Sequence, residues 1–337
     1  MRAGKVTQTI YRRSILKQLH IEKESMLLAP SQEESCYGIR TTDGEQVVVS
    51  DISLYGNDKD LCVFAMAKAA NDLATKGARV KGFSIRLLLP EYAYESRLKM
   101  MVALAEEAAQ KEHLQILEAN AQSVPAIHTT IVQVTALGTA REGAILQCHS
   151  AKPEQDIVQV KWIGLEGALR VKREKQEKLK ERFIPAFIDK VEAGREELFS
   201  VSALETAAAA SVSAMHQIGD GGIFAALWEL AESAEIGLCV DLRKMAVKQE
   251  TIEVCEYFHL NPYQLTSTGC VLLVTEKGEE LADALSRNGT PATVIGRTTK
   301  ETERVIMNGG EKRYLDRPAQ DEFARFFAEL HAEHISK

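Results

Sequence analysis

The sequence has no apolar run near the about 20 residues that a helix needs to cross a bilayer. Its first eight residues (Met-Arg-Ala-Gly-Lys-Val-Thr-Gln) lack the apolar core of a secretory signal peptide. We therefore expect a soluble, cytoplasmic protein without a membrane partner. An excess of positive charge is also missing: the formal net charge is -7, and the densest basic stretch, residues 172–182, is interrupted by glutamates. That stretch predicts a solvated helix, and we expect no nucleic-acid partner.

Cysteine pairs with the spacing of a zinc or redox site are absent as well. The six cysteines are scattered, and several lie in apolar segments where a thiol packs as a small hydrophobic group. We expect all of them to be reduced and structural. The histidines, among them His128 and His216, show no metal-ligand spacing, and we expect them to be structural too.

The length points to two domains. A chain of 337 residues with 45% apolar content can bury a large core and exceeds the usual size of one domain. Polar turn residues at 151–156 (Ala-Lys-Pro-Glu-Gln-Asp) mark a boundary. We predict an N-terminal domain over residues 1–150 and a C-terminal domain over residues 151–337.

In the first half, strands alternate with helices, which predicts an α/β protein. A hairpin is expected where two β-branched runs flank Asp43-Gly44, because this dipeptide tolerates the positive φ of a tight turn. A helix predicted at 61–76 has apolar residues at helical spacing and Gly77 at its C-cap. The other expected elements are a helix at 96–111 and strands at 82–89, 129–137 and 114–117, the last of them buried.

The second half also mixes helices and strands. Apolar residues recur at helical spacing after Gln320, which predicts a C-terminal helix docked on the protein. The other predicted helices lie around 169–188, at 203–216, after the loop 217–222 and at 279–288. The predicted strands are 157–162, 237–242, 270–275 and 293–296.

Three polar residues of the first half could bind a cofactor. Asp51 ends the run Val-Val-Val-Ser-Asp, where a carboxylate can project from the edge of a sheet into a cleft. Asn71 and Asp72 interrupt an apolar helix, and burying such a pair is costly unless each group finds a partner. Because Mg²⁺ takes hard oxygen ligands, we predict that Asp51 and Asp72 hold Mg²⁺ and that Asn71 helps to bind the cofactor. A role for these aspartates in capping or ion pairs is the alternative.

The second half offers a candidate anion site. Gly219-Asp220-Gly221-Gly222 stands directly before a helix, so backbone N–H groups and the positive helix end could face a phosphate. The loop has neither the dinucleotide fingerprint nor a P-loop ending. We predict that Gly219, Asp220, Gly221 and Gly222 bind the cofactor, and an ordinary turn is the alternative.

Taken in order, these motifs resemble the superfamily of aminoimidazole-ribonucleotide (AIR) synthetase, selenophosphate synthetase and thiamine-monophosphate kinase. The likeness is greatest to its HypE branch of hydrogenase maturation factors and spans most of the chain. Residues 69–79 (Ala-Ala-Asn-Asp-Leu-Ala-Thr-Lys-Gly-Ala-Arg) are similar to the family's Asn-Asp helix. Residues 163–167 (Ile-Gly-Leu-Glu-Gly) are similar to the start of its second domain. Further similarity to HypE-like second domains is found at residues 214–223, 227–232 and 261–270.

The resemblance implies a two-domain AIR-synthase-like fold of the α/β (α+β) class. Its N-terminal mixed sheet would form a barrel across a homodimer, and a C-terminal α/β domain would follow. The resemblance further implies ATP and Mg²⁺ as cofactors and phosphoryl transfer from ATP to an amide or carbonyl oxygen. The acceptor would be a small molecule or protein that the sequence does not identify.

The sequence departs from the family's pattern at three places. Residues 31–38 (Ser-Gln-Glu-Glu-Ser-Cys-Tyr-Gly) stand where the family has a Gly-Asp-Asp-Ala loop, which leaves Glu33 and Glu34 as stand-ins. Asn120 replaces a metal-binding aspartate, and Gln217 replaces the aspartate before the glycines. A neutral amide compensates less of the Mg²⁺ charge than a carboxylate does.

Two hypotheses about function follow. The chain is either a Mg²⁺-dependent phosphoryl-transfer enzyme or a non-catalytic relative that acts as a binding or regulatory module in a maturation assembly. The resemblance to HypE implies a carbamoyl-carrying cysteine at the C-terminus, whereas this sequence has no thiol after Cys270. Because Cys270 lies in an apolar strand, we expect it to be inaccessible and the carrier step to be missing.

Overall fold

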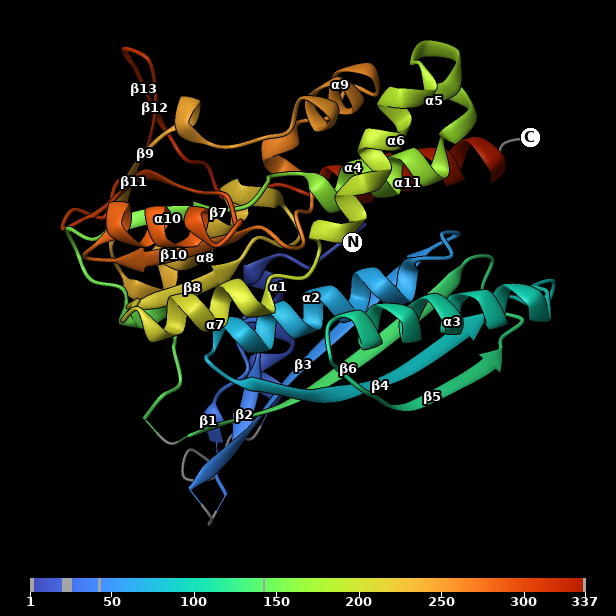
Figure 1. Cartoon of the computed structure of the whole chain (residues 1–337), viewed down its shortest axis with the longest axis horizontal. Helices are drawn as coiled ribbons and strands as arrows, with labels where there is room; N and C mark the ends of the chain where they lie inside the picture. The colour runs from blue at the N-terminus through green and yellow to red at the C-terminus, as the bar shows by residue number, and fades with distance from the viewer. Residues whose placement is uncertain (1–2, 20–25, 42–43, 142, 336–337) are drawn as a thin grey trace. The chain divides into compact units, whose positions relative to one another are not determined.

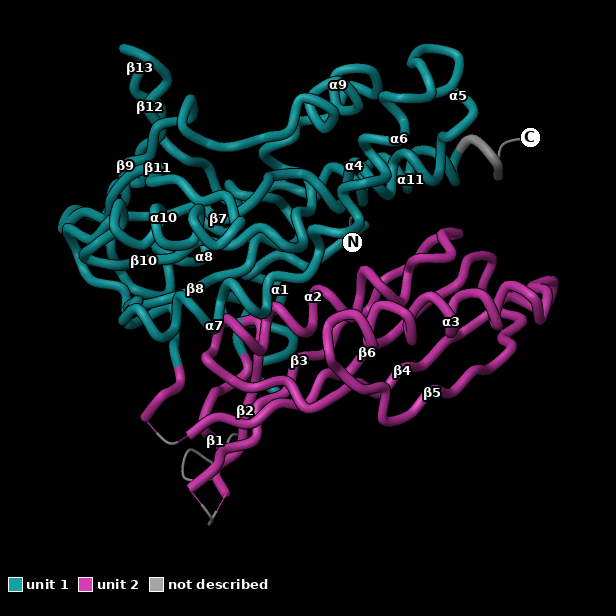
Figure 2. The backbone as a smooth tube through the Cα atoms, in the orientation of Figure 1, with its two compact units in different colours: residues 1–20, 31–34, 146–337 teal, residues 21–30, 35–145 magenta. Residues whose placement is uncertain are grey.

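The computed structural model describes residues 3–19, 26–41, 44–141 and 143–335, which form two compact units (Figure 2). The N-terminal unit comprises residues 21–30 and 35–145. The C-terminal unit comprises residues 146–337 together with 1–20 and 31–34. The first twenty residues therefore group with the C-terminal unit, whereas the division predicted from sequence places them in the domain 1–150.

A mixed sheet and two helices make up the described part of the N-terminal unit (Figure 1). The strand order is β1-β2-β3-β6-β4-β5, in which β4 and β5 are parallel and the other neighbours antiparallel. The strands are β1 (Met26–Leu28), β2 (Tyr37–Ile39), β3 (Glu45–Gly56), β4 (Arg79–Leu89), β5 (Ile116–Ser123) and β6 (Thr130–Arg141). The helices are α2 (Leu61–Thr75) and α3 (Glu95–Lys111). The turn residues 42–43 of the predicted hairpin lie outside the described residues.

Helix α2 packs on β3 and β6, whose side chains alternate between buried and exposed positions. This period of two places every second residue of each strand against the helix. All fifteen residues of α2 are buried. The predicted C-cap is confirmed, because Gly77 follows the helix with φ +69°, a conformation that favours glycine.

Strand β5 is exposed, which corrects the expectation of a buried strand at 114–117. Apolar residues in this segment predict burial, but β5 lies at the edge of the described sheet, where β4 is its neighbour. Leu117 is 50% exposed. Position in the sheet, rather than the local run of apolar residues, decides burial here.

The described part of the C-terminal unit holds a second mixed sheet, of order β13-β12-β9-β11-β7-β10-β8. Its strands are β7 (Asp156–Val160), β8 (Ala214–Gln217), β9 (Gly237–Asp241), β10 (Val271–Thr275), β11 (Ala292–Thr299), β12 (Arg304–Asn308) and β13 (Glu311–Tyr314). The longer helices are α1 (Gln8–Ser14), α4 (Leu165–Glu174), α5 (Gln176–Arg182), α6 (Pro185–Ala193), α7 (Val201–Ala209), α8 (Gly222–Ala234), α9 (Gln249–Tyr257), α10 (Gly278–Arg287) and α11 (Glu322–Ile335). Short 3-10 helices are η1 (Leu16–Gln18), η2 (Cys148–Ser150), η3 (Gly194–Glu197), η4 (Leu242–Lys244) and η5 (Pro262–Gln264). All residues of β10 are buried, so the core of this unit includes this strand, which lies second from the β8 edge of the sheet.

One predicted helix of this unit is wrong in its second half. The helix expected at 203–216 ends as α7 at Ala209, and Ala214–Gln217 form strand β8, which pairs antiparallel with β10. A short apolar run fits a buried strand as well as a buried helix, and the neighbouring strand decides between them.

The C-terminal helix α11 is docked, as predicted. The rings of Phe323, Phe326 and Phe327 are buried, and the Arg170 guanidinium of α4 lies 3.9 Å from the centroid of the Phe323 ring. Such a cation over an aromatic face adds to the stabilisation from apolar burial. Across the described ranges, no helix is long and apolar enough to span a membrane.

Candidate functional site

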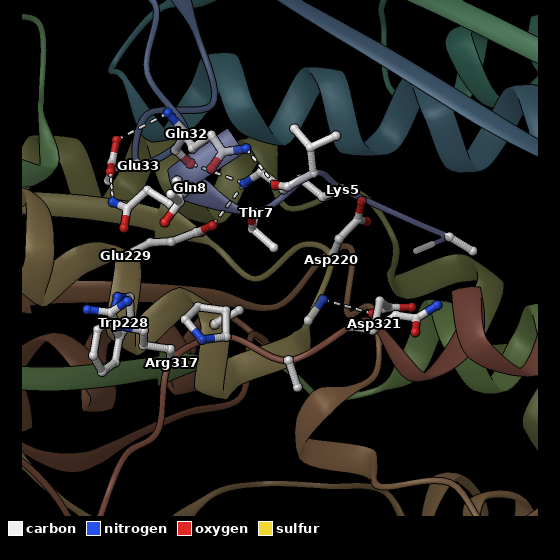
Figure 3. Close-up of a pocket in the computed structure, with 18 residues that line it drawn as sticks. Lys5, Thr7, Gln8, Gln32, Glu33, Asp220, Trp228, Glu229, Arg317 and Asp321 are labelled. Carbon is white, nitrogen blue, oxygen red and sulfur yellow. Dashed lines mark hydrogen bonds and ion pairs between the residues drawn. The ribbon is translucent and has the colours of Figure 1, made fainter. Parts of the chain in front are cut away.

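A cavity of about 360 Å³ lies within the C-terminal unit (Figure 3). Four segments that are separated in sequence form its walls: the N-terminal segment with the start of α1, residues 32–33, the glycine loop with the first turns of α8, and the loop before α11. The polar residues that line it are Lys5, Thr7, Gln8, Thr9, Gln32, Glu33, Asp220, Glu229, Arg317, Gln320 and Asp321, and Trp228 is the aromatic one. Its size suits a small molecule or part of a nucleotide.

Ion pairs hold the N-terminal wall of the cavity against α8. Lys5 Nζ lies 2.8 Å from Glu229 Oε1 and donates a second hydrogen bond to the Gln32 carbonyl oxygen. Gln32 Nε2 in turn donates to the carbonyl oxygen of Val6 at 2.8 Å. The predicted stand-in Glu33 lies in the same wall, where it accepts hydrogen bonds from Gln8 and Arg12.

The predicted glycine loop, residues 219–222, reaches the cavity through Asp220 and Gly221. The Gly221 N–H donates to the Asp321 carboxylate at 2.9 Å, and the Gly222 N–H donates to the Gly219 carbonyl oxygen at 3.1 Å. The loop therefore already holds a carboxylate from its own unit. A phosphate that used the Gly221 N–H would have to displace Asp321.

Asp321 is a site residue that the motif analysis missed. Its Oδ1 also accepts the N–H groups of Phe323 and Ala324, so the side chain caps the start of α11. Burial and the nearby charge of Asp220 raise the pKa of Asp321 to about 7. A local signal for the cap existed, because Asp followed by Glu and an apolar run is typical of a helix start. The link to Gly221, 100 residues away, had no local signal.

Asp51 lies in the N-terminal unit on the exposed face of β3. Tyr37 Oη donates to Asp51 Oδ2 at 2.5 Å, and Thr135 Oγ1 donates to Asp51 Oδ1. Burial and this hydrogen bond raise the pKa of Tyr37 to about 12, which keeps it protonated as a donor. Both oxygens of Asp51 are thus occupied by hydroxyl groups of neighbouring strands.

Asn71 and Asp72 are buried in α2, and Ser50 Oγ donates to Asp72 Oδ2 at 3.1 Å. Ser50 and Asp51 are consecutive in β3 and face opposite sides of the sheet. The structure therefore does not bring Asp51 and Asp72 together. Among the residues that the structure describes, no group of three or more His, Cys, Asp or Glu is arranged to hold a metal ion.

The other departures from the family pattern are dispersed. Glu34 Oε1 accepts the N–H of Cys148 at 2.7 Å, and Gln217 is buried in β8. Asn120 is exposed on the edge strand β5. None of these three residues lines the cavity.

The first prediction concerns the pair Asp220 and Asp321. Because the pKa of Asp321 is higher in the folded chain than in the unfolded chain, the folded state binds more protons between about pH 4 and 7, and stability falls as pH rises through this range. Asp220→Asn removes one cause of that shift. We expect the loss of unfolding free energy from pH 5 to pH 8, measured by urea denaturation, to shrink by about 1 kcal/mol.

Asp316→Asn, which removes an exposed carboxylate of the same loop, is the control and should leave the pH dependence unchanged. If the unfolding free energy falls equally from pH 5 to pH 8 in Asp220→Asn and in the parent chain, the two carboxylates do not interact.

Residues 152–308 match the family described as AIR synthase related protein, C-terminal domain. The chain is 26% identical over 337 residues to a putative hydrogenase expression/formation protein of Methanocaldococcus jannaschii, a match that covers 96% of both chains. It is 25% identical over 267 residues to the carbamoyl dehydratase HypE of Rhodobacter capsulatus, covering 77% of this chain and 75% of the relative.

A solved structure of the hydrogenase maturation protein HypE in complex with ATP has the same fold. The TM-score is 0.71 at 17% identity, and the match covers 95% of this chain and 97% of the other. Domain match, relatives and fold agree in supporting an AIR synthase-related protein similar to HypE.

Proposed function

We propose that the protein is a HypE-like ATP-binding component of a maturation assembly. The names of its relatives, a hydrogenase expression/formation protein and a carbamoyl dehydratase, support this class of process. The ATP complex of a protein with the same fold supports the ligand. The acceptor or partner, a small molecule or a protein, is not identified by any feature of the chain. The proposal includes a cytoplasmic location, because the six cysteines, all within the described ranges, form no disulfide.

The geometry favours binding without turnover. The observation that carries this view is the separation of Asp51 and Asp72. Asp72 lies in α2 on one side of the sheet, and Asp51 points to the other side. Each carboxylate accepts a hydrogen bond from a hydroxyl group. Carboxylates so placed do not fit a shared Mg²⁺ ion within the unit. The non-catalytic binding or regulatory module is therefore the better supported of the two hypotheses.

The cavity of the C-terminal unit offers a place for part of the nucleotide. Lys5 and Arg317 supply positive charge, and the Trp228 ring supplies an aromatic surface. The predicted cofactor residues Gly219 to Gly222 lie at its edge, where Asp321 holds the Gly221 N–H. Protonation of Asp321 would weaken its competition with a phosphate for that N–H.

Mg²⁺-dependent phosphoryl transfer from ATP to an amide or carbonyl oxygen is the second candidate function. The burial of Asn71 and Asp72 inside α2 favours it, because a buried polar pair costs free energy that an apolar pair would avoid. In this case Asp72 would hold Mg²⁺, and Asp51 would not be a ligand of the same ion.

The second prediction separates these two functions. ATP at 100 times its Kd should raise the unfolding free energy by about 2.7 kcal/mol, seen as a higher melting temperature. For the binding module, we expect this rise to persist in EDTA and in Asp51→Asn, with no ADP formed. Glu118→Gln, which changes another exposed carboxylate of the same sheet, is the matched control.

Phosphoryl transfer predicts the opposite result, namely stabilisation that requires Mg²⁺ and release of ADP. The result for Asp72→Asn is interpreted separately. Its effect on the hydrogen bond from Ser50 should itself cost about 1 kcal/mol of stability. Absence of any ATP-induced shift, with or without Mg²⁺, would exclude both functions.

The homodimer is part of the same proposal, and the third prediction tests it. Tyr37, Val49 and Leu137 lie side by side on β2, β3 and β6, on the sheet face opposite α2. Tyr37 and Leu137 are 38% and 36% exposed, which gives this face an apolar row. Leu137→Lys should convert a dimer into a monomer in sedimentation, because a buried unpaired charge opposes association.

Met100→Lys, which changes an exposed apolar residue of α3, is the control and should leave the dimer intact. A parent chain that sediments as a monomer at micromolar concentration would contradict the dimer.

A further inference from the structure

Cys148, His216 and Glu229 form one row of contacts in the C-terminal unit. His216 Nδ1 lies 3.4 Å from Cys148 Sγ, and His216 Nε2 lies 3.0 Å from Glu229 Oε2. The three side chains come from η2, β8 and α8. The thiol and the imidazole are buried, whereas Glu229 reaches the cavity wall and pairs with Lys5. Cys148 and His216 do not line the cavity proposed for ATP, whereas Glu229 does.

The charges along the row support a proton on the imidazole. Burial opposes charge on His216, but Cys148 and Glu229 beside its two ring nitrogens raise its pKa to about 10. Burial also acts against the Glu229 charge, yet Lys5 and His216 lower the pKa of Glu229 below its usual value. Imidazolium, carboxylate and ammonium then alternate in sign along His216, Glu229 and Lys5.

One further carboxylate faces the row. Glu34 accepts the backbone N–H of Cys148 at 2.7 Å and lies on the backbone side of this cysteine. His216 Nδ1 instead lies 3.4 Å from the sulfur, where the imidazole can exchange a proton with the thiol. The contact with His216 is the feature that sets Cys148 apart from an ordinary buried thiol.

Other cysteines lie in settings that suppress ionisation. Burial raises the pKa of Cys62 and Cys255 to about 12 and raises the pKa of Cys270 further. Cys62 and Cys255 belong to helices, and Cys270 directly precedes the buried strand β10. Ionising any of these thiols, or exposing it, requires disruption of a core element.

Cys148 lies instead on η2, a turn of three residues at the surface. His149 and Ser150 of this turn are exposed, and its backbone is closed by hydrogen bonds from Ser150 and Ala151. Opening such a turn costs far less than global unfolding. Because Cys148 packs in a small buried cluster with Ala214 and Leu230, small molecules would reach the sulfur only when this turn opens locally.

We infer that Cys148 is a modification site for small soft electrophiles, peroxides in particular, activated by the pair His216 and Glu229. The thiolate sulfur attacks one peroxide oxygen, the S–O bond forms and the O–O bond breaks. The departing hydroxide takes the Nδ1 proton of His216 and leaves as water. Cys148 is oxidised to a sulfenic acid, and the peroxide is reduced to water.

The fourth prediction tests the ionisation and the reaction separately on the full chain. The ultraviolet thiolate absorbance at pH 7, taken as parent minus Cys148→Ser, should be present in the parent chain and lost in His216→Gln and Glu229→Gln. Dimedone trapping after hydrogen peroxide, with mass spectrometry of each cysteine peptide, should label Cys148 at least about tenfold faster than Cys255.

Glu232→Gln is the matched control, since Glu232 lies on the same helix and pairs with Arg304 instead of His216. It should leave both the absorbance and the labelling of Cys148 unchanged, and circular dichroism checks that each variant is folded. A parent chain without thiolate absorbance from Cys148 at pH 7 would overturn the inference. Equal oxidation rates of Cys148 in the parent chain and in folded His216→Gln would overturn it as well.

Discussion

The buried carboxylate of Asp321 fixes the geometry on which the candidate site depends. It accepts the N–H of Gly221 at the start of α8 and the N–H groups of Phe323 and Ala324 at the start of α11. The positive ends of two helices thereby share one negative side chain, which stabilises both ends. The stacking of Arg170 on Phe323 then holds α11 along α4. The cavity exists because these helix starts are held together on one side of it.

The glycine loop shows why a motif can predict geometry without predicting its occupant. Gly222 has φ +66°, and a Cβ atom there would lie 2.4 Å from the Tyr263 carbonyl oxygen, so glycine is needed at this position. The loop presents an N–H group to an anion, as the sequence predicts. The anion is the side chain of Asp321 rather than an external phosphate, and nothing within residues 219–222 distinguishes these two cases.

Much of the fold could be predicted because periodicity and turn chemistry are local. Helix α2 with Gly77, the helix after the glycine loop, and the docked α11 follow from residues within each element. The predictions fail where a part of the chain that is distant in sequence decides whether a segment is buried or forms a strand. Strand β5 is exposed because it lies at a sheet edge, and Ala214–Gln217 is a strand because β10 lies beside it. The same limit applies to the site. The sequence predicts Asp51 and Asp72 to share one metal ion, but Asp72 lies in α2 on one side of the sheet and Asp51 points to the other side.

Glu229 connects the cavity with the buried thiol, which neither the motifs nor the cysteine spacing reveals. One of its oxygens faces Lys5 at the cavity wall, and the other faces His216 in the interior. A ligand that displaces Lys5 would remove the positive charge from one side of Glu229 and strengthen its pull on the His216 proton. Because linkage is reciprocal, protonation of His216 would change the affinity of the cavity for such a ligand by the same factor as the ligand changes the proton affinity of His216. From the sequence, Cys148 and His216 are expected to be structural, and their contact has no local signal, since Cys148, His216 and Glu229 are separated by 68 and 13 residues and meet in the folded unit.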